Sequence, residues 1–450
     1  MMDAETIVKL GIKAGFDEVV ADTYLSRRSY LKIANSKVDS IVTKFENSGS
    51  LFVSSKKRIF FTNIDRLEKK EVDAAIARSK KVIQMVQPKE DYFGLAEGPF
   101  KYKKASAPDK KIESISNEGI ADIAYAAING ASGGGATNVA GTVFVRYSEN
   151  ELATSKSVHA NGAGSEVRLS IRTFRGSNFS AQDVNTSQKL SGLNPEKLGN
   201  ETAMIASRAN RTGRIESGIY DLVYAQSPGG SLVYMTNAMA CIGNVETGSS
   251  WFTGKLNKPV ASPDINIYDD GNMDGAIAAS PYDDEGYPTQ KTALIKNGKL
   301  LSYLHNYSTA KKYKTKSTGN AGLVEPGANT MLFEHKKKVK DIDALIERLE
   351  KGIVITNTWY TRFSNYLTGD FSTVPRDIAL YVENGEVKFA IKQRDVGSMV
   401  GIRITDNMVR MLKNTECAAR DTKQASNWDT EGDYFFMPSI LVRGATVSVA

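Results

Sequence analysis

Two acidic turns hold the residues of this sequence that are best placed to do chemistry. Each turn is a run of carboxylates closed by a glycine, and the carboxylates are Asp269, Asp270, Asp283, Asp284 and Glu285. An oxygen-rich group of this kind could bind Ca²⁺ or Mg²⁺. Asp also stabilises turns by accepting hydrogen bonds from nearby backbone, so the pattern does not require a ligand. We expect turn formers, with a stand-alone hydrolase that uses a carboxylate site near residues 269–285 as an alternative.

The sequence offers few residues for a transition-metal site or a covalent nucleophile. Its three histidines are far apart along the chain: His159, His305 and His335. The two cysteines, Cys241 and Cys417, lie in an apolar and an amphipathic segment and are typical of core residues. No Gly-x-Ser-x-Gly elbow occurs. We therefore expect no catalytic residue, no metal and no cofactor in this chain.

A third polar group combines arginines with aromatic residues after residue 355. Arg362 and Arg376 flank Asp370, and Trp359 and Asp377 lie close to them in the sequence. Such side chains suit an extended peptide backbone or a carboxylate. The alternative is a structural Arg–Asp network inside a β core. Our candidate contacts to a substrate or cavity are Arg362, Asp370, Arg376, Asp283, Asp284 and Glu285.

Composition limits the class of protein. A chain of 450 residues is expected to form two or three domains, and 41% apolar with 24% charged residues is typical of a soluble globular protein. The net charge of +7 is spread over small lysine clusters without aromatic platforms, so we expect no specific nucleic-acid partner. No apolar run is long enough for a membrane span, and residues 1–13 do not resemble a signal peptide. Only two cysteines favour a reducing compartment, so we expect the cytoplasm.

The elements that must position these residues follow from hydrophobic periodicity. Helical spacing at residues 5–14 and 67–84 encloses a region of alternating strands, residues 18–63. The same order returns in a helix at 112–128, strands at 141–181 and a helix at 195–208, with glycines from Gly130 onward expected to end the first of these helices. We predict an α+β fold with two small related units, residues 1–100 and 109–215, and a β-rich domain, residues 216–450.

The β-rich domain is marked by hairpin signals. Asn297-Gly298 and Asn384-Gly385 each follow an alternating run. A strand at 220–225 leads into a buried helical segment at 232–242. We also expect helices at 341–351 and 409–420, and a strand at the end of the sequence.

The order of motifs in residues 248–329 resembles the TldD/PmbA family. Gly248-x-Ser250 is followed by both acidic turns, a polar hairpin and the run Ser-Thr-Gly-Asn-Ala at 317–321. The resemblance implies the fold of that family's C-terminal domain, with the Thr368–Phe371 segment along an internal cavity.

TldD-like members of the family carry a His-Glu-x-x-x-His zinc motif, and this sequence departs from it. An alignment without gaps from Gly248 places the motif positions on Val233, Tyr234 and Ala238, and residues 424–442 lack the cysteine expected as a further ligand. The chain thus resembles the PmbA (TldE) branch. The resemblance implies a non-catalytic subunit that pairs with a TldD-like zinc metalloprotease acting on unfolded or small peptides. A peptide-binding homodimer without a proteolytic role is a further alternative.

Overall fold

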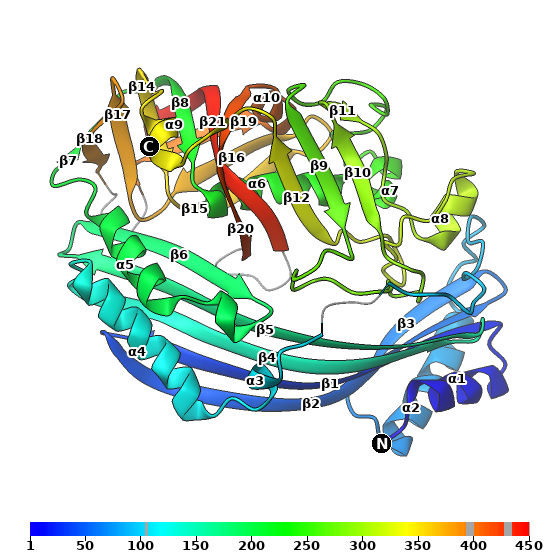
Figure 1. Cartoon of the computed structure of the whole chain (residues 1–450). Helices are drawn as coiled ribbons and strands as arrows, with labels where there is room; N and C mark the ends of the chain where they lie inside the picture. The colour runs from blue at the N-terminus through cyan, green and yellow to red at the C-terminus, as the bar shows by residue number, and fades with distance from the viewer. Residues whose placement is uncertain (104–106, 393–399, 427–433, 450) are drawn as a thin grey trace.

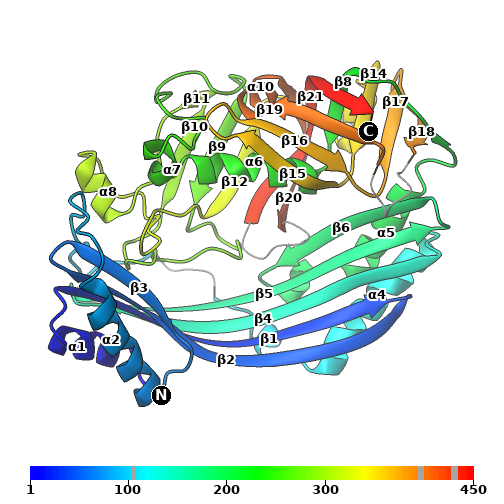
Figure 2. The same ribbon diagram turned by 180° about the vertical axis from the view of Figure 1, so that it is seen from behind.

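The protein is built of two layers that face each other (Figure 1). The computed structural model describes residues 1–103, 107–392, 400–426 and 434–449. A curved sheet from the first half of the chain forms one layer, and the C-terminal half lies on its concave side (Figures 1 and 2). The predicted α+β class is confirmed. No helix in the described part of the chain is long and apolar enough to cross a membrane.

The curved sheet is made by two repeats of helix, three strands and helix. The first repeat comprises α1 (Ala4–Lys13), β1 (Glu18–Ala34), β2 (Lys37–Ser55), β3 (Arg58–Ile64) and α2 (Lys69–Ile83). After the short α3 (Lys110–Glu113), the second comprises α4 (Asn117–Gly133), β4 (Asn138–Thr154), β5 (Val158–Arg175), β6 (Phe179–Ser187) and α5 (Pro195–Ala206). The described strands follow the order β3-β2-β1-β4-β5-β6, and β1 pairs antiparallel with β4. The two predicted units therefore share one sheet.

Strand alternation decides which face of this sheet carries the helices. Odd-numbered residues such as Val19 and Leu51 pack against α1 and α2, and Leu31 packs against α4. Even-numbered Val20 and Phe52 lie on the opposite face, where they meet the C-terminal half. Several short strands that the sequence predicts are continuous in the structure, as in β1 and β2. The polar residues in the middle of β1 lie within the strand and do not form a turn.

Helix α4 begins and ends later than predicted, since Ile112 belongs to the separate α3 and α4 continues through Gly130 to Gly133. A Cβ atom at Gly130 would lie 1.9 Å from the carbonyl oxygen of Glu196 on α5, and one at Gly199 would lie 2.1 Å from that of Ala127. These glycines let two helix backbones approach closely, so the expectation that Gly130 ends the helix was wrong.

The C-terminal half forms a mixed sheet of 15 strands in the described residues. Its strands are β7 (Thr212–Gly213), β8 (Gly218–Tyr224), β9 (Ile265–Asp270), β10 (Lys291–Lys296), β11 (Lys299–Leu300), β12 (Thr330–His335), β13 (Lys338–Val339), β14 (Lys351–Ile355), β15 (Thr358–Asn365), β16 (Asp370–Pro375), β17 (Ala379–Glu383), β18 (Glu386–Ile391), β19 (Ile402–Asn407), β20 (Thr415–Ser426) and β21 (Tyr434–Val449). Its helices are α6 (Gln226–Met239), α7 (Ile242–Glu246), α8 (Tyr307–Lys312), α9 (Ile342–Ile346) and α10 (Met408–Lys413). Strand β21 lies between β8 and β12 in this sheet.

Two predicted helices are shorter than expected. Asp341 caps α9 as predicted, but the helix ends at Ile346 and is followed at Lys351 by β14. The segment 409–420 begins as α10, then becomes β20, because residues from Thr415 pair with β21. Tertiary pairing overrides helix propensity in both places. The predicted hairpins at Asn297-Gly298 and Asn384-Gly385 are confirmed, with positive φ at all four residues.

Candidate functional site

Helix α6 contains Val233, Tyr234 and Ala238, the positions onto which the family resemblance places the zinc motif. Val233 is fully buried, Tyr234 packs its ring 6.5 Å from that of Phe435, and Ala238 packs against the same apolar cluster. An aliphatic chain, a methyl group and a buried phenol cannot supply the imidazole, thiolate and carboxylate ligands that zinc requires. Within the described ranges, no three His, Cys, Asp or Glu side chains are grouped so as to hold a metal ion. The residues present do not fit a zinc site.

The first turns of α6 pack closely against strand β21. A Cβ atom at Gly230 would lie 2.0 Å from the ring of Phe435 on β21. Glycine at this position allows the helix and the strand to pack directly. The close packing fills the space around α6 with apolar side chains.

Asp269 is a buried structural anchor rather than a reactive carboxylate. Its two oxygens accept hydrogen bonds from the side-chain amides of Asn237, Asn320 and Asn329, at 2.7–3.2 Å, and from the backbone N–H of Asn329. Burial raises the pKa of this fully buried carboxyl, and the amide donors oppose that shift. Asp269 thereby ties α6 to β9 and to the Ser-Thr-Gly-Asn-Ala run.

The carboxylates of the second acidic turn differ in their hydrogen bonding within the described residues: Asp283 and Glu285 accept hydrogen bonds from the backbone, and Asp284 does not. Asp283 accepts hydrogen bonds from the backbone N–H groups of Glu285, Tyr287 and Ala321. Glu285 is buried and accepts one from the N–H of Tyr307 at the start of α8. The side chain of Asp284 reaches solvent and accepts no hydrogen bond from a described residue. Desolvation raises the pKa of buried Asp283 to about 7, and the protein that closely surrounds the solvent-accessible Asp284 raises the pKa of that carboxyl to about 6.

This turn faces the concave side of the N-terminal sheet. Asn150 on β4 donates hydrogen bonds to Tyr282, at 3.1 Å, and to Asp22 on β1, at 3.4 Å. Burial raises the pKa of Asp22 to about 6, and the charge of Asp284 adds to the shift. Asp22 was not among the predicted site residues, because an isolated Asp in an alternating strand carries no signal of its own.

The predicted Arg–Asp group is spread along a hairpin rather than gathered. Arg362 is exposed on β15 opposite Ser372, and the guanidinium of Arg376 lies 3.8 Å from the ring centroid of Trp359. Asp370 accepts hydrogen bonds from Thr368 and Asn407, which lower its pKa. The whole of β16 lies between Asp370 and Arg376. Among the interactions seen between described residues, none is a hydrogen bond or ion pair that joins Arg362, Asp370 or Arg376 to the acidic turn.

Two polar contacts that sequence reasoning missed join the layers. The fully buried Asp377 forms an ion pair with Arg172 of β5, with 3.0 Å between Oδ1 of Asp377 and Nε of Arg172. Asp377 also accepts hydrogen bonds from the side chains of Ser180 and Asn357. Glu166 of β5, also buried, pairs with Arg146 at 2.9 Å and accepts from the hydroxyl of Tyr434 on β21. The contacts that cross between the layers, Arg172 to Asp377 and Tyr434 to Glu166, join residues more than two hundred positions apart in sequence, so only the fold brings them together.

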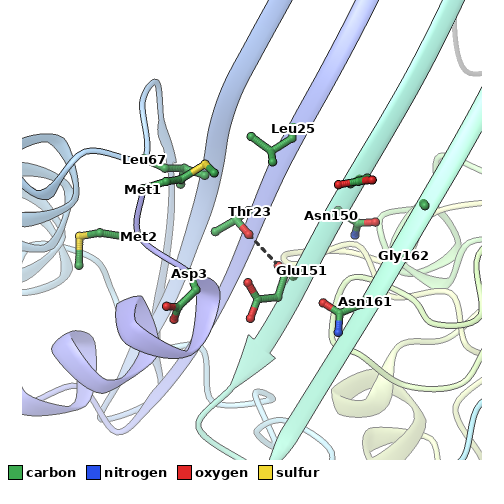
Figure 3. Close-up of a pocket in the computed structure, with 12 residues that line it drawn as sticks. Met1, Met2, Asp3, Thr23, Leu25, Leu67, Asn150, Glu151, Asn161 and Gly162 are labelled. Atoms are coloured by element: carbon green, nitrogen blue, oxygen red, sulfur yellow. Dashed lines mark hydrogen bonds between the residues drawn. The ribbon is translucent and has the colours of Figure 1, made fainter. Parts of the chain in front are cut away.

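Three cavities lie near these elements. One of about 490 Å³ lies on the helix-bearing face of the sheet, with Met1, Thr23 and Glu151 among its lining residues (Figure 3). Another, of about 440 Å³, lies between α5 and the first turn of α6. A third, of about 540 Å³, lies where β3 ends beside β2. The six predicted contact residues line none of these three.

The two-layer α+β protein is related to metallopeptidases, as comparison with known families shows. Residues 217–449 match the family model described as the PmbA/TldA metallopeptidase C-terminal domain. The match covers more than half of the chain, so this protein belongs to the PmbA/TldD family.

Curated relatives match over part of their length. The metalloprotease PmbA homolog of Haemophilus influenzae is 27% identical over 241 residues, which are 54% of this chain and 46% of the relative. The metalloprotease PmbA of Escherichia coli O157:H7 is 25% identical over 242 residues, 53% of this chain and 45% of the relative. An uncharacterized protein of Methanocaldococcus jannaschii is 33% identical over 151 residues, 32% of this chain and 34% of the relative. The matches thus span about half or less of these relatives.

Solved structures share the fold over the whole chain. TldE from Thermococcus kodakarensis superposes with a TM-score of 0.85 at 21% identity, over 99% of both chains. A proposed modulator of a DNA gyrase from Thermotoga maritima MSB8 gives a TM-score of 0.83 at 22% identity, over 99% of both chains. At this identity the likeness establishes architecture.

Proposed function

We propose that this chain is a TldE-like, non-catalytic subunit of a metalloprotease complex. The zinc would lie in a TldD-like partner that cleaves unfolded or small peptides, and this chain would shape the enclosed space and support the partner. The compartment proposed for the complex is the cytoplasm, where the two buried cysteines, Cys241 and Cys417, would stay reduced.

The main support for this proposal is that apolar side chains occupy the α6 positions where the family resemblance predicts the zinc motif. Hydrolysis of an amide needs an activated water and stabilisation of the oxyanion. Val233, Tyr234 and Ala238 provide neither a metal ligand nor a general base in the place where metal-bearing relatives have them.

A peptidase assay with three samples tests the proposal. Casein or short unstructured peptides are incubated with this chain alone, with a TldD-like partner alone, and with both. We expect cleavage that requires the partner, rises when this chain is added and disappears with chelator. The Arg362→Ala and Arg376→Ala variants report whether the β15–β16 hairpin assists substrate binding, since each should then lower the assisted rate while leaving the melting temperature unchanged.

The competing function is a stand-alone hydrolase that uses the acidic turn. The raised pKa values of Asp22 and Asp284 are the observation in its favour, because a carboxyl that titrates near neutral pH suits general acid–base catalysis. Cleavage by this chain alone that survives chelator and repurification, and is abolished by Asp284→Asn, would establish this function and overturn the non-catalytic assignment.

A further inference from the structure

Half of strand β2 has a free edge. The strand pairs with β1 along its length, from Ala34 opposite Lys37 to Glu18 opposite Ser54. On its outer side it pairs with β3 only from Gly49 to Ser55. Across the described residues, none forms a backbone hydrogen bond to the outer side of Lys37–Ser48.

The free stretch is only partly protected as an edge strand. It contains no proline, and its one bulge against β1, at Asp39, lies next to the hairpin turn, so that Ser40–Ser48 pair with β1 in an unbroken register. Val42 on the concave face is 52% exposed, and Phe45 on the helix-bearing face is 78% exposed. A long edge with apolar residues on both faces is a template for another strand.

The geometry of a two-fold pairing selects one register. If a two-fold axis perpendicular to the sheet relates the two copies, their β2 strands run antiparallel. The helix-bearing faces of the two sheets then lie on the same side, and so do the concave faces. The register that uses the whole free stretch places Thr43 on the axis. Ile41 then lies opposite Phe45 of the copy, a β-branched and aromatic pair on each side of the axis, which favours association.

The charges are compatible with this register. Lys44 lies opposite Val42 of the copy and Glu46 opposite Ser40, so no like charges face each other directly. The hairpin tip of the copy, with Lys37 beside it, would reach the cavity of about 540 Å³ at the end of β3. That cavity is lined by Asp65, Glu68 and Glu46, of which Glu46 already pairs with Arg28 at 3.3 Å, and Arg66 is the one basic residue in its lining. The cavity therefore attracts the basic end of the opposing strand.

We propose that β2 pairs edge to edge with β2 of a second copy of this chain, which joins the two curved sheets into one. The pairing converts the free N–H and C=O groups of Val38–Ser48 into a ladder and covers Phe45. It does not depend on the function proposed above, because it concerns an edge far from α6 and needs no zinc-bearing partner.

Variants at Val42 test both the interface and its register. Val42→Arg places an arginine opposite Lys44 of the copy, and we expect it to raise the dimer dissociation constant by about tenfold or more. Val42→Arg combined with Lys44→Glu sets opposite charges across the axis and should restore the dimer. Leu367→Arg is the matched control, since Leu367 is also 52% exposed but lies after β15. Sedimentation at graded concentrations of the purified chain gives the constants.

Hydrogen exchange provides a second readout. In the wild-type dimer, amides of residues 38–48 should exchange slowly, and in Val42→Arg they should exchange fast, while the melting temperature stays the same. A chain that is monomeric at all concentrations, or a dimer that Val42→Arg leaves intact, would overturn the proposal. Protection of this edge only after a TldD-like partner is added would assign the edge to that partner instead and likewise overturn it.

Discussion

At the scale of single residues, α6 is packed with apolar side chains at the positions where the family resemblance predicts the zinc motif. The ring of Tyr234 packs with that of Phe435. Val233 is fully buried in the same cluster. The apolar residues therefore contribute to the core, and burial of such side chains stabilises the fold by about 1.5–3 kcal/mol each.

The first prediction at this scale concerns metal content. The chain purified without chelator should contain far less than one zinc per molecule, because α6 offers no ligand. Elemental analysis after mild purification measures this, and a TldD-like chain treated in the same way is the positive control. One tightly bound zinc per chain, lost on chelation together with thermal stability, would contradict the assignment.

The residue scale also shows what the sequence could and could not predict. The second acidic turn was recognised as a turn, and Asp283 accepts hydrogen bonds from it as expected for an Asx motif. The expectation of a turn former was wrong for Asp269, which lies inside β9 and accepts from distant partners. The network around Asp269 was out of reach, since its three amide donors come from separate elements. A side chain that acts through distant partners leaves no local pattern.

At the scale of elements, the pairing of α4 with α5 depends on two glycines. Sequence reasoning treats glycine in a helix as a breaker because it lowers helix propensity. Here Gly130 and Gly199 each face a backbone carbonyl of the other helix. The close packing of the two helices outweighs the low helix propensity of glycine. The sequence around Gly130 does not reveal this packing, because it depends on the residues of α5.

A glycine-to-alanine pair tests this interpretation. Gly130→Ala should lower the free energy of unfolding by about 2 kcal/mol or more, because the new methyl group overlaps Glu196 and the helices must separate. Gly133→Ala, at the end of the same helix, meets no atom within 4 Å and should change stability by less than about 1 kcal/mol. Chemical denaturation of both variants provides the comparison. Equal losses would show that α5 does not pack closely at Gly130.

Strand prediction succeeded where local chemistry decided the outcome. The Asn-Gly turns predicted both hairpins, and alternation predicted the strand region that contains β1. It failed for β20, where residues around Cys417 have helical spacing but pair with Leu441 of β21. Alternation also gave no hint that β1 and β4 would lie side by side, since that pairing joins segments more than a hundred residues apart.

At the scale of the whole molecule, carboxylates meet where the two layers touch. Asp22 comes from the curved sheet, and Asp283, Asp284 and Glu285 come from the C-terminal half. Tyr92, Glu18 and Lys156 lie on the same side, with Glu18 accepting a hydrogen bond from Tyr92 and pairing with Lys156 at 3.5 Å. A single lysine does not neutralise this group.

The pH dependence of stability follows from these carboxyls. Their pKa values are raised above the ordinary 3.8, to about 6 for Asp22 and Asp284 and about 7 for Asp283. The folded state thus holds protons that the unfolded chain releases. The stabilisation is complete below the ordinary pKa and is lost as pH rises through 6 to 7. Asp22→Asn with Asp284→Asn should make the melting temperature depend less on pH.

Scanning calorimetry between pH 5 and pH 8 measures the effect. The melting temperature of the double variant relative to wild type should increase by about 2 °C or more across this range. Asp73→Asn serves as the control, because Asp73 forms an exposed ion pair with Lys69 on α2. If the melting temperature of the double variant changes with pH as that of the wild type does, Asp22 and Asp284 do not cause the pH dependence of stability.

The central position of β21 has a consequence for how the chain acquires its structure during synthesis. Ribosomes make β8 more than two hundred residues before β21, yet β21 is the strand that pairs with it along Gly218–Tyr224. Strands β8 and β12 therefore emerge without the neighbour that joins them, and the C-terminal sheet closes only after translation has passed residue 440. A nascent chain that stalls earlier exposes unpaired apolar edges, which chaperones and proteases recognise. The order of synthesis thus makes assembly of this half a late, all-or-none event.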